Sequence, residues 1–139
     1  WAWGVADTSG IAPDIKLFVL YHDPKRSPAL PHSVGMQKGL FGIVHVFADA
    51  RMMGSNDTVI AHELLHTLGA SDKYDLSTSS PRHPDGYAEP DRKPLHPQEL
   101  AELMGGRIPI DADSAEIPES LHEVVVGPMT AAEIGWTDR

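Results

Sequence analysis

Two histidines in the stretch His62-Glu63-Leu64-Leu65-His66 are the clearest chemical signal in the sequence. In a helix, side chains four positions apart project from the same face one turn apart, so both imidazoles can reach a single ion. Glu63 flanks them, where its carboxylate can contact a water molecule beside that ion. The chain has no cysteine, so only His, Asp and Glu are candidate zinc ligands. The spacing predicts a zinc site of the kind used by hydrolases, with Glu63 as general base.

The segment after His66 offers a third ligand. Gly69 can end the helix in the left-handed conformation and turn the chain back toward the metal, which places Asp72 well for zinc binding. Glu99 or Glu102, on a downstream helix, is the alternative. That alternative gives Gly69 and Asp72 no role and requires a proline-rich segment to deliver a helix to the metal. We expect Asp72 to be the ligand.

Together, His62, Glu63, His66, Gly69 and Asp72 form the pattern H-E-x-x-H-x-x-G-x-x-D, which resembles the signature of the metzincin clan of zinc metallopeptidases. The aspartate in the last position looks like the snapalysin-type variant. The resemblance implies an α+β catalytic domain with a small mixed sheet, an active-site helix, a Met-turn and a C-terminal helix. It also implies one catalytic zinc ion, a peptide or protein substrate, and an extracytoplasmic location, secreted or periplasmic.

Two residues that follow this motif are also assigned roles. Met104 is followed by Gly105 and Gly106, which permit a tight turn, and it resembles the Met-turn that lies beneath the metal; the alternative is a methionine that fills a gap in the core. Tyr74 is expected to be catalytic, with its phenol donating to the substrate oxyanion; the alternative is a half-buried packing tyrosine.

Two strands are expected before the active-site helix, at 14–21 and 40–47, because both segments are rich in β-branched and aromatic residues. The resemblance implies that 40–47 is an edge strand, with which an extended peptide pairs in antiparallel fashion. The prolines and glycine of 23–39 favour a loop between the strands. The helix itself is predicted from Thr58 to Gly69, with N-cap oxygens from the preceding residues 55–57.

The second half of the chain is expected to be mostly irregular. Five prolines between positions 77 and 97 predict a long surface loop. A short helix is predicted at 98–104. A closing helix is predicted at 128–136, with Thr130 as its N-cap and Glu133 in the capping-box position.

Length and composition limit the remaining possibilities. With 139 residues, of which 41% are hydrophobic, the chain is expected to form a single domain. The resemblance implies that this domain is a zinc-peptidase catalytic domain, and we expect a monomer. Eleven basic and twenty acidic residues give a net charge of −9, and no Lys/Arg cluster favours nucleic acid as a partner. No apolar run reaches the length of about eighteen residues that spans a membrane, so no membrane contact is expected from this segment. The first residue is Trp1, which indicates a processed protein or a fragment of a longer one.

Other functions remain open at this point. A catalytically silent, zinc-stabilised binding domain is one alternative, although Glu63 is unnecessary for structural zinc binding. Asp85, Glu89 and Asp91 lie near one another in the loop and offer oxygen ligands for calcium, against the alternative of a solvated acidic surface.

Overall fold

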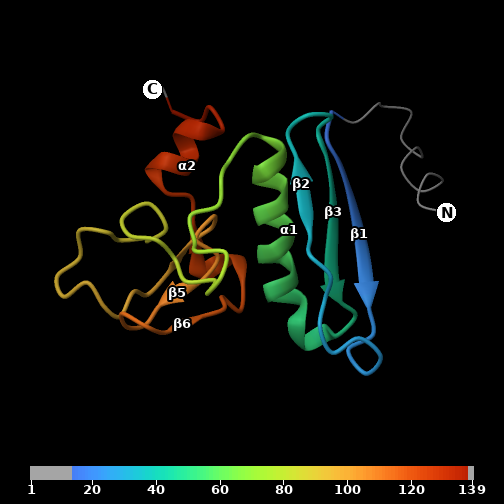
Figure 1. The fold of residues 1–139 in the computed structure, drawn as a ribbon, viewed down its shortest axis with the longest axis horizontal. Helices are drawn as coiled ribbons and strands as arrows, with labels where there is room; N and C mark the ends of the chain where they lie inside the picture. The colour runs from blue at the N-terminus through green and yellow to red at the C-terminus, as the bar shows by residue number, and fades with distance from the viewer. Residues whose placement is uncertain (1–13, 138–139) are drawn as a thin grey trace.

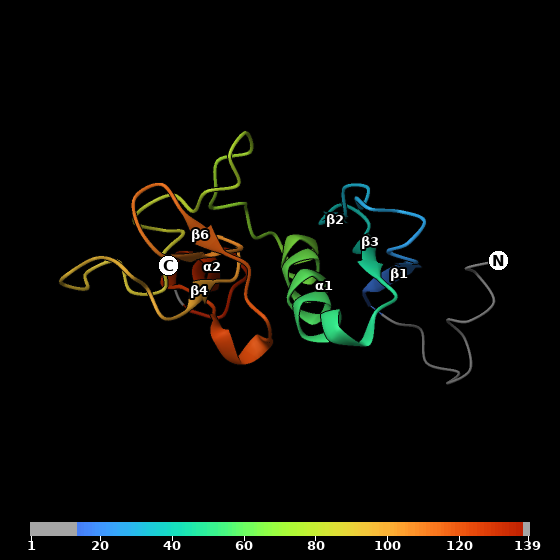
Figure 2. The same ribbon diagram turned by 90° about the horizontal axis from the view of Figure 1, so that it is seen from below.

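The structure, a computed structural model that describes residues 14–137, has one long helix between a three-stranded sheet and an irregular C-terminal half (Figures 1 and 2). The helix is α1 (Met53–Thr67). The sheet consists of β1 (Lys16–His22), β2 (Val34–Met36) and β3 (Phe41–Phe47). The fold therefore belongs to the mixed α+β class that the sequence predicts. Among the helices of the described residues, none is long and apolar enough to cross a membrane.

The sheet has the strand order β1-β3-β2, with β1 parallel and β2 antiparallel to β3. The prediction that 40–47 forms an edge strand is wrong, because β3 lies in the centre and β2 forms the edge. The loop expected at 23–39 contains this edge strand. β2 has only three residues, and Gly35 at its centre lies opposite Gly42 of β3. The position of β2 is set by its contacts with β3 and α1. A three-residue strand is too short to show the alternation of apolar and polar residues that would predict it from sequence.

The helix predicted to carry the metal site begins five residues before the predicted start at Thr58. The 3₁₀ turn η2 (Ala50–Met52) leads directly into α1, and the Asp49 side chain caps η2 by accepting from the Arg51 N–H. Asn56, one of the expected caps, lies inside the helix instead, and its side chain bonds to both backbone groups of Phe47. The predicted stop is present, because Gly69 adopts φ +105° just after the helix.

Short strand pairs and turns dominate the C-terminal half. The helix predicted at 98–104 is absent. Part of this segment forms β4 (Ala101–Glu102), and the Gln98 side chain bonds to the backbone of Glu89 and Leu95. These contacts and the pairing of β4 with a strand at residues 124 and 125 override local helix propensity. The segment 77–97 forms turns and bends, as predicted. The short elements of this half are β4 (Ala101–Glu102), β5 (Ile108–Pro109), β6 (Ala115–Glu116), the 3₁₀ turn η3 (Leu121–Glu123) and β7 (Val124–Val125).

The closing helix α2 (Pro128–Glu133) is shorter than predicted, and its expected capping box is wrong. Gly127 is the N-cap and Pro128 stands in the first turn, where the fixed φ of proline favours the helix. Thr130 is therefore inside the helix, and its hydroxyl donates to the Glu102 carboxylate. Glu133 turns to the segment after α1, where it meets Lys73. Both side chains connect α2 to distant parts of the chain.

Apolar residues pack against α1 from two sides. On the sheet side, Val44 and Val46 are fully buried, and α1 packs against β3 and β2. On the other side, Leu65 joins a buried cluster with Ala70, Leu103 and Met104. The helix is thus fixed between both halves. Its residues His62, Glu63 and His66 line a cavity.

Candidate metal centre

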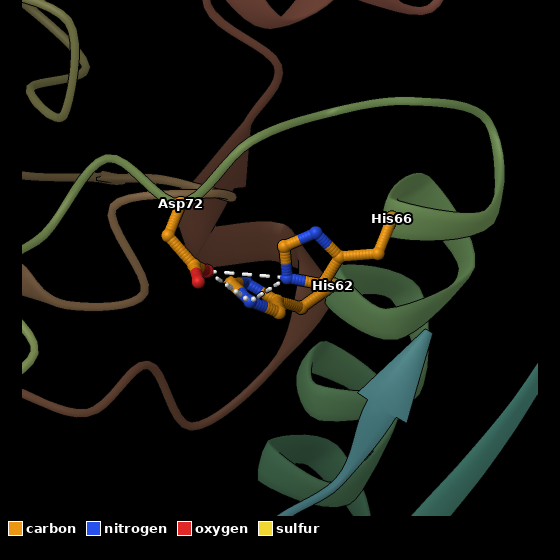
Figure 3. Close-up of side chains that lie close together, drawn as sticks. All are labelled: His62, His66 and Asp72. Atoms are coloured by element: carbon orange, nitrogen blue, oxygen red, sulfur yellow. Dashed lines mark hydrogen bonds and ion pairs between the residues drawn. The ribbon is translucent and has the colours of Figure 1, made fainter. Parts of the chain in front are cut away.

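His62, His66 and Asp72 converge at the C-terminal end of α1 (Figure 3). The Oδ1 atom of Asp72 lies 3.1 Å from Nε2 of His62 and 3.1 Å from Nε2 of His66, and the two Nε2 atoms are 3.1 Å apart. Asp72 comes from the extended segment that follows Gly69. These three form the one group of at least three His, Asp or Glu side chains within residues 14–137 whose ligand atoms converge in this way.

Backbone carbonyls fix the orientation of both imidazoles. Nδ1 of His62 lies 2.9 Å from the Leu103 carbonyl, and Nδ1 of His66 lies 2.8 Å from the Ala70 carbonyl. A carbonyl oxygen only accepts, so each Nδ1 must carry the proton. In the neutral tautomers, both Nε2 lone pairs then point at each other and at the Asp72 carboxylate, an arrangement that a cation between them stabilises.

The donor set fits a divalent metal ion. In a tetrahedral zinc site, with bonds of about 2.0–2.1 Å, neighbouring ligand atoms are about 3.3 Å apart. The three separations of 3.1 Å are close to that value. Two imidazoles, each held at Nδ1 by a backbone carbonyl, and one carboxylate also match the ligand types that zinc prefers. The group can therefore bind a metal ion without rearrangement of the chain.

The directions of the pKa shifts of His62 and Asp72 indicate that the site stabilises positive charge. Burial lowers the pKa of His62, but the hydrogen bonds with Asp72 and Leu103 and the nearby carboxylates outweigh it, so the pKa is raised. Burial raises the pKa of Asp72, but the hydrogen bond from His62 and the charges of both histidines bring it below its usual value. A proton or a metal ion is thus attracted to the same point.

Neither alternative third ligand belongs to the group of converging ligand atoms. Glu99 is 75% exposed at its side chain and pairs with Arg92. Glu102 is fully buried, and its carboxylate accepts from groups of the following turn and of α2. The calcium interpretation also lacks a converging group: Glu89 pairs with Arg92, and Asp85, Glu89 and Asp91 are absent from the one group found within residues 14–137.

Glu63 follows the candidate ligand His62 directly, and one of its carboxylate oxygens accepts no hydrogen bond within the described residues. The residue is buried, and its Oε2 atom has no hydrogen-bond partner within the described part of the chain. Burial raises the pKa of Glu63. The charges of His62 and His66 and a hydrogen bond from Gly35 act in the opposite direction, but the net effect is a raised pKa. A buried carboxylate with a free oxygen and a raised pKa is suited to accept a proton from a bound molecule.

Tyr74 lies near the candidate ligands His62 and Asp72. Its ring centroid is 6.1 Å from that of His62. Burial, together with the charge of Asp72 and a hydrogen bond to it, raises the pKa of Tyr74 to about 12. The phenol is therefore protonated near neutral pH and can act as a donor, as the sequence-based hypothesis requires.

The turn predicted around Met104 is present and lies against His62. Met104 is fully buried in the core cluster, and the Leu103 carbonyl holds His62. Glu102 stabilises this turn from within, because its Oε2 accepts from the Gly105 N–H at 2.8 Å. The carboxylate of Glu102 thus supports the carbonyl that orients a ligand, a role that the sequence did not reveal.

A cavity of about 630 Å³ surrounds the candidate centre. Its lining includes His62, Glu63, His66, Asp72 and Tyr74, together with the edge strand β2 and the residues before it. Gly35 of β2 lies so close to α1 that a Cβ atom there would be 2.2 Å from the Glu63 carbonyl oxygen and 2.7 Å from Cβ of His66. Only glycine lets the edge strand border the site at this distance.

No protein family model matches the chain, and neither a curated protein nor a solved structure shows significant similarity to it. The function therefore has to be inferred from the residues and their geometry.

Ser71, Lys73 and Glu133 form a further set of contacts beside the candidate centre, which the sequence did not predict. Lys73 and Ser71, on either side of Asp72, bond to Glu133 of α2. A lysine beside a candidate ligand gives no sequence signal of burial, and Glu133 carries the expected signature of a capping residue. The pairing becomes visible only when α2 is placed in the fold.

Proposed function

We propose that this protein is a zinc-dependent peptidase of the metzincin type, with His62, His66 and Asp72 as the zinc ligands. The observation that carries the proposal is the convergence of three ligand atoms at 3.1 Å, with both histidine tautomers fixed by carbonyls. The sequence pattern H-E-x-x-H-x-x-G-x-x-D and the turn at Met104 support the assignment to the metzincin clan. By the same resemblance, we propose that the protein acts outside the cytoplasm.

Zinc, when bound, supplies a Lewis acid that polarises the substrate carbonyl and makes water more acidic. Glu63 performs the proton transfers. Its free Oε2 atom takes a proton from the attacking water, whose oxygen forms a bond to the carbonyl carbon. The same carboxyl group then delivers that proton to the amide nitrogen as the C–N bond breaks. The products are a carboxylic acid and an amine, and no covalent enzyme intermediate is required.

Tyr74 is assigned to the oxyanion that develops on the substrate carbonyl. Its raised pKa, about 12, keeps the phenol protonated, and a donor aimed at developing charge stabilises the transition state more than the ground state.

An extended peptide is the substrate class that best fits the cleft. β2 is an edge strand that borders the cavity, and a free strand edge can pair with an extended chain through backbone hydrogen bonds. The volume of about 630 Å³ lies in the usual range for ligand sites. The peptide would then lie along β2 with its scissile carbonyl beside Glu63.

A zinc-stabilised binding domain without activity is the competing function. Such a domain has no use for a buried carboxylate whose oxygen lacks a partner, because an unsatisfied buried oxygen costs about 1–3 kcal/mol. Glu63→Gln separates the two functions. We expect wild type and Glu63→Gln to bind one equivalent of zinc, measured by mass spectrometry of the metal, and only wild type to hydrolyse an unstructured protein such as casein. Equal hydrolysis by both, or none by zinc-loaded wild type against a broad peptide library, would contradict the proposal.

A further inference from the structure

The carboxylate of Glu133, in α2, binds both neighbours of Asp72. Its Oε2 accepts from the Ser71 N–H at 3.0 Å and from Nζ of Lys73 at 2.7 Å, and its Oε1 accepts from the Ser71 hydroxyl at 2.7 Å. These partners lie 62 and 60 positions away in the sequence. One side chain thus fastens the residue before and the residue after the candidate third ligand.

The Lys73 end of this contact is buried, whereas the Glu133 side chain is 26% exposed. The Lys73 side chain is only 4% exposed, and its Nζ also donates to the Ser71 carbonyl at 3.0 Å and lies 3.3 Å from the Ser71 hydroxyl. Removal of Glu133 would leave this ammonium group without a countercharge, which is strongly unfavourable in a buried position. The segment would then have to move so that Lys73 reaches water, and Asp72 would move with it.

Asp72 has no regular structure to hold it in place. Residues 70–73 belong to neither a helix nor a strand. The backbone of Lys73 is held on the far side, where its N–H donates to the Met104 carbonyl at 2.9 Å and its carbonyl accepts from the Arg82 N–H at 2.7 Å. On the near side, between Gly69 and Asp72, the contacts of Ser71 with Glu133 are the anchor to α2.

We propose that Glu133 is a positioning residue for the metal centre, which holds Asp72 at the distance where its carboxylate completes the site with His62 and His66. This inference rests on the proposed function. It assigns to the C-terminal helix a role in metal affinity that its packing alone does not require. Groups that orient metal ligands typically contribute about 10- to 100-fold to metal affinity, and that is the loss expected when Glu133 is removed.

The test compares zinc affinity, measured by competition with a chromophoric chelator, in wild type, Glu133→Ala, Glu133→Gln and the control Glu99→Ala. Glu99 likewise pairs with a basic residue, Arg92, but its own side chain is exposed at the surface. We expect weaker zinc binding by about 10- to 100-fold for Glu133→Ala, a smaller loss for the isosteric Glu133→Gln, and wild-type affinity for Glu99→Ala. The melting temperature of each metal-free variant shows whether it is folded under the conditions of the titration.

A double-mutant cycle with Asp72→Ala distinguishes positioning from a general structural role. If Glu133 acts through Asp72, Glu133→Ala should not weaken the residual zinc binding of Asp72→Ala any further. An equal loss in both backgrounds, or unchanged affinity in folded Glu133→Ala and Glu133→Gln, would overturn the inference while leaving the zinc site intact. Failure of wild type to bind zinc would overturn the proposed function, and this inference with it.

Discussion

Replacement of Glu102 by glutamine tests whether a buried carboxylate supports the turn that orients His62. The Glu102 carboxylate accepts from Gly105 N at 2.8 Å, from Gly127 N at 3.1 Å and from the Thr130 hydroxyl at 2.6 Å. Glutamine has the same shape as glutamate, but its NH₂ group cannot accept a hydrogen bond, and it must face at least one of these donors. The donors that still face the amide oxygen then bond to a neutral group instead of a carboxylate. Hydrogen bonds to charged groups contribute about 1.5–3 kcal/mol each, and an unsatisfied buried group costs about 1–3 kcal/mol. We therefore expect Glu102→Gln to lower the free energy of unfolding by about 2–4 kcal/mol.

Urea unfolding of the metal-free protein, followed by circular dichroism, measures this loss. The matched control is Glu99→Gln, three positions earlier, where the side chain is 75% exposed and pairs with Arg92 at the surface. Exposed ion pairs contribute about 0–1 kcal/mol, so the control should stay close to wild type. A loss for Glu102→Gln no larger than that of the control would refute the role assigned to this carboxylate.

Three further changes have defined outcomes. Gly35→Ala should destabilise the protein by about 1–3 kcal/mol, because the new Cβ would lie 2.2 Å from the Glu63 carbonyl oxygen; chemical unfolding that matches the exposed neighbour Val34→Ala would contradict this. Tyr74→Phe should lower kcat by about 100-fold in a peptide-hydrolysis assay, and an unchanged kcat would remove the phenol from the oxyanion site. Burial raises the pKa of Glu133, but Lys73 and Ser71 bring it below its ordinary value of 4.5. Its stabilising contribution is therefore fully present above the pKa of the unfolded chain and is lost as the pH falls through the lower folded pKa. The stability difference between metal-free wild type and Glu133→Gln should shrink in acid, and a difference that grows there would contradict the pairing.

The helix that carries the candidate metal centre was the most predictable part of the fold. Its two histidines, Glu63 and the stop at Gly69 are local signals that need no tertiary information, and the structure has the helix, its stop and the convergence of Asp72 with both histidines. The start of the helix was missed because Asn56, which resembles a cap, is used to bind the end of β3.

The predictions were wrong for elements whose conformation is set by residues distant in the sequence. The segment 98–104 has helical composition, yet the buried Glu102 carboxylate and the pairing of β4 with β7 give it an extended and turned form. β2 is too short to show alternation. Gly35 lets it approach α1 closely, and Gly42 leaves room for β2 beside β3. The ion pair between Glu133 and Lys73 depends on the position of α2 in the fold, which no local sequence pattern predicts.

Zinc stoichiometry and affinity in wild type, Asp72→Ala and Glu99→Ala test the central claim most directly. Metal content after dialysis and competition with a chelator give both quantities on the same samples. The three converging ligand atoms predict one zinc per chain in wild type and in Glu99→Ala, and a large loss of affinity in Asp72→Ala. Full zinc retention by Asp72→Ala, or its loss in Glu99→Ala, would contradict the assignment of the third ligand and of the family with it.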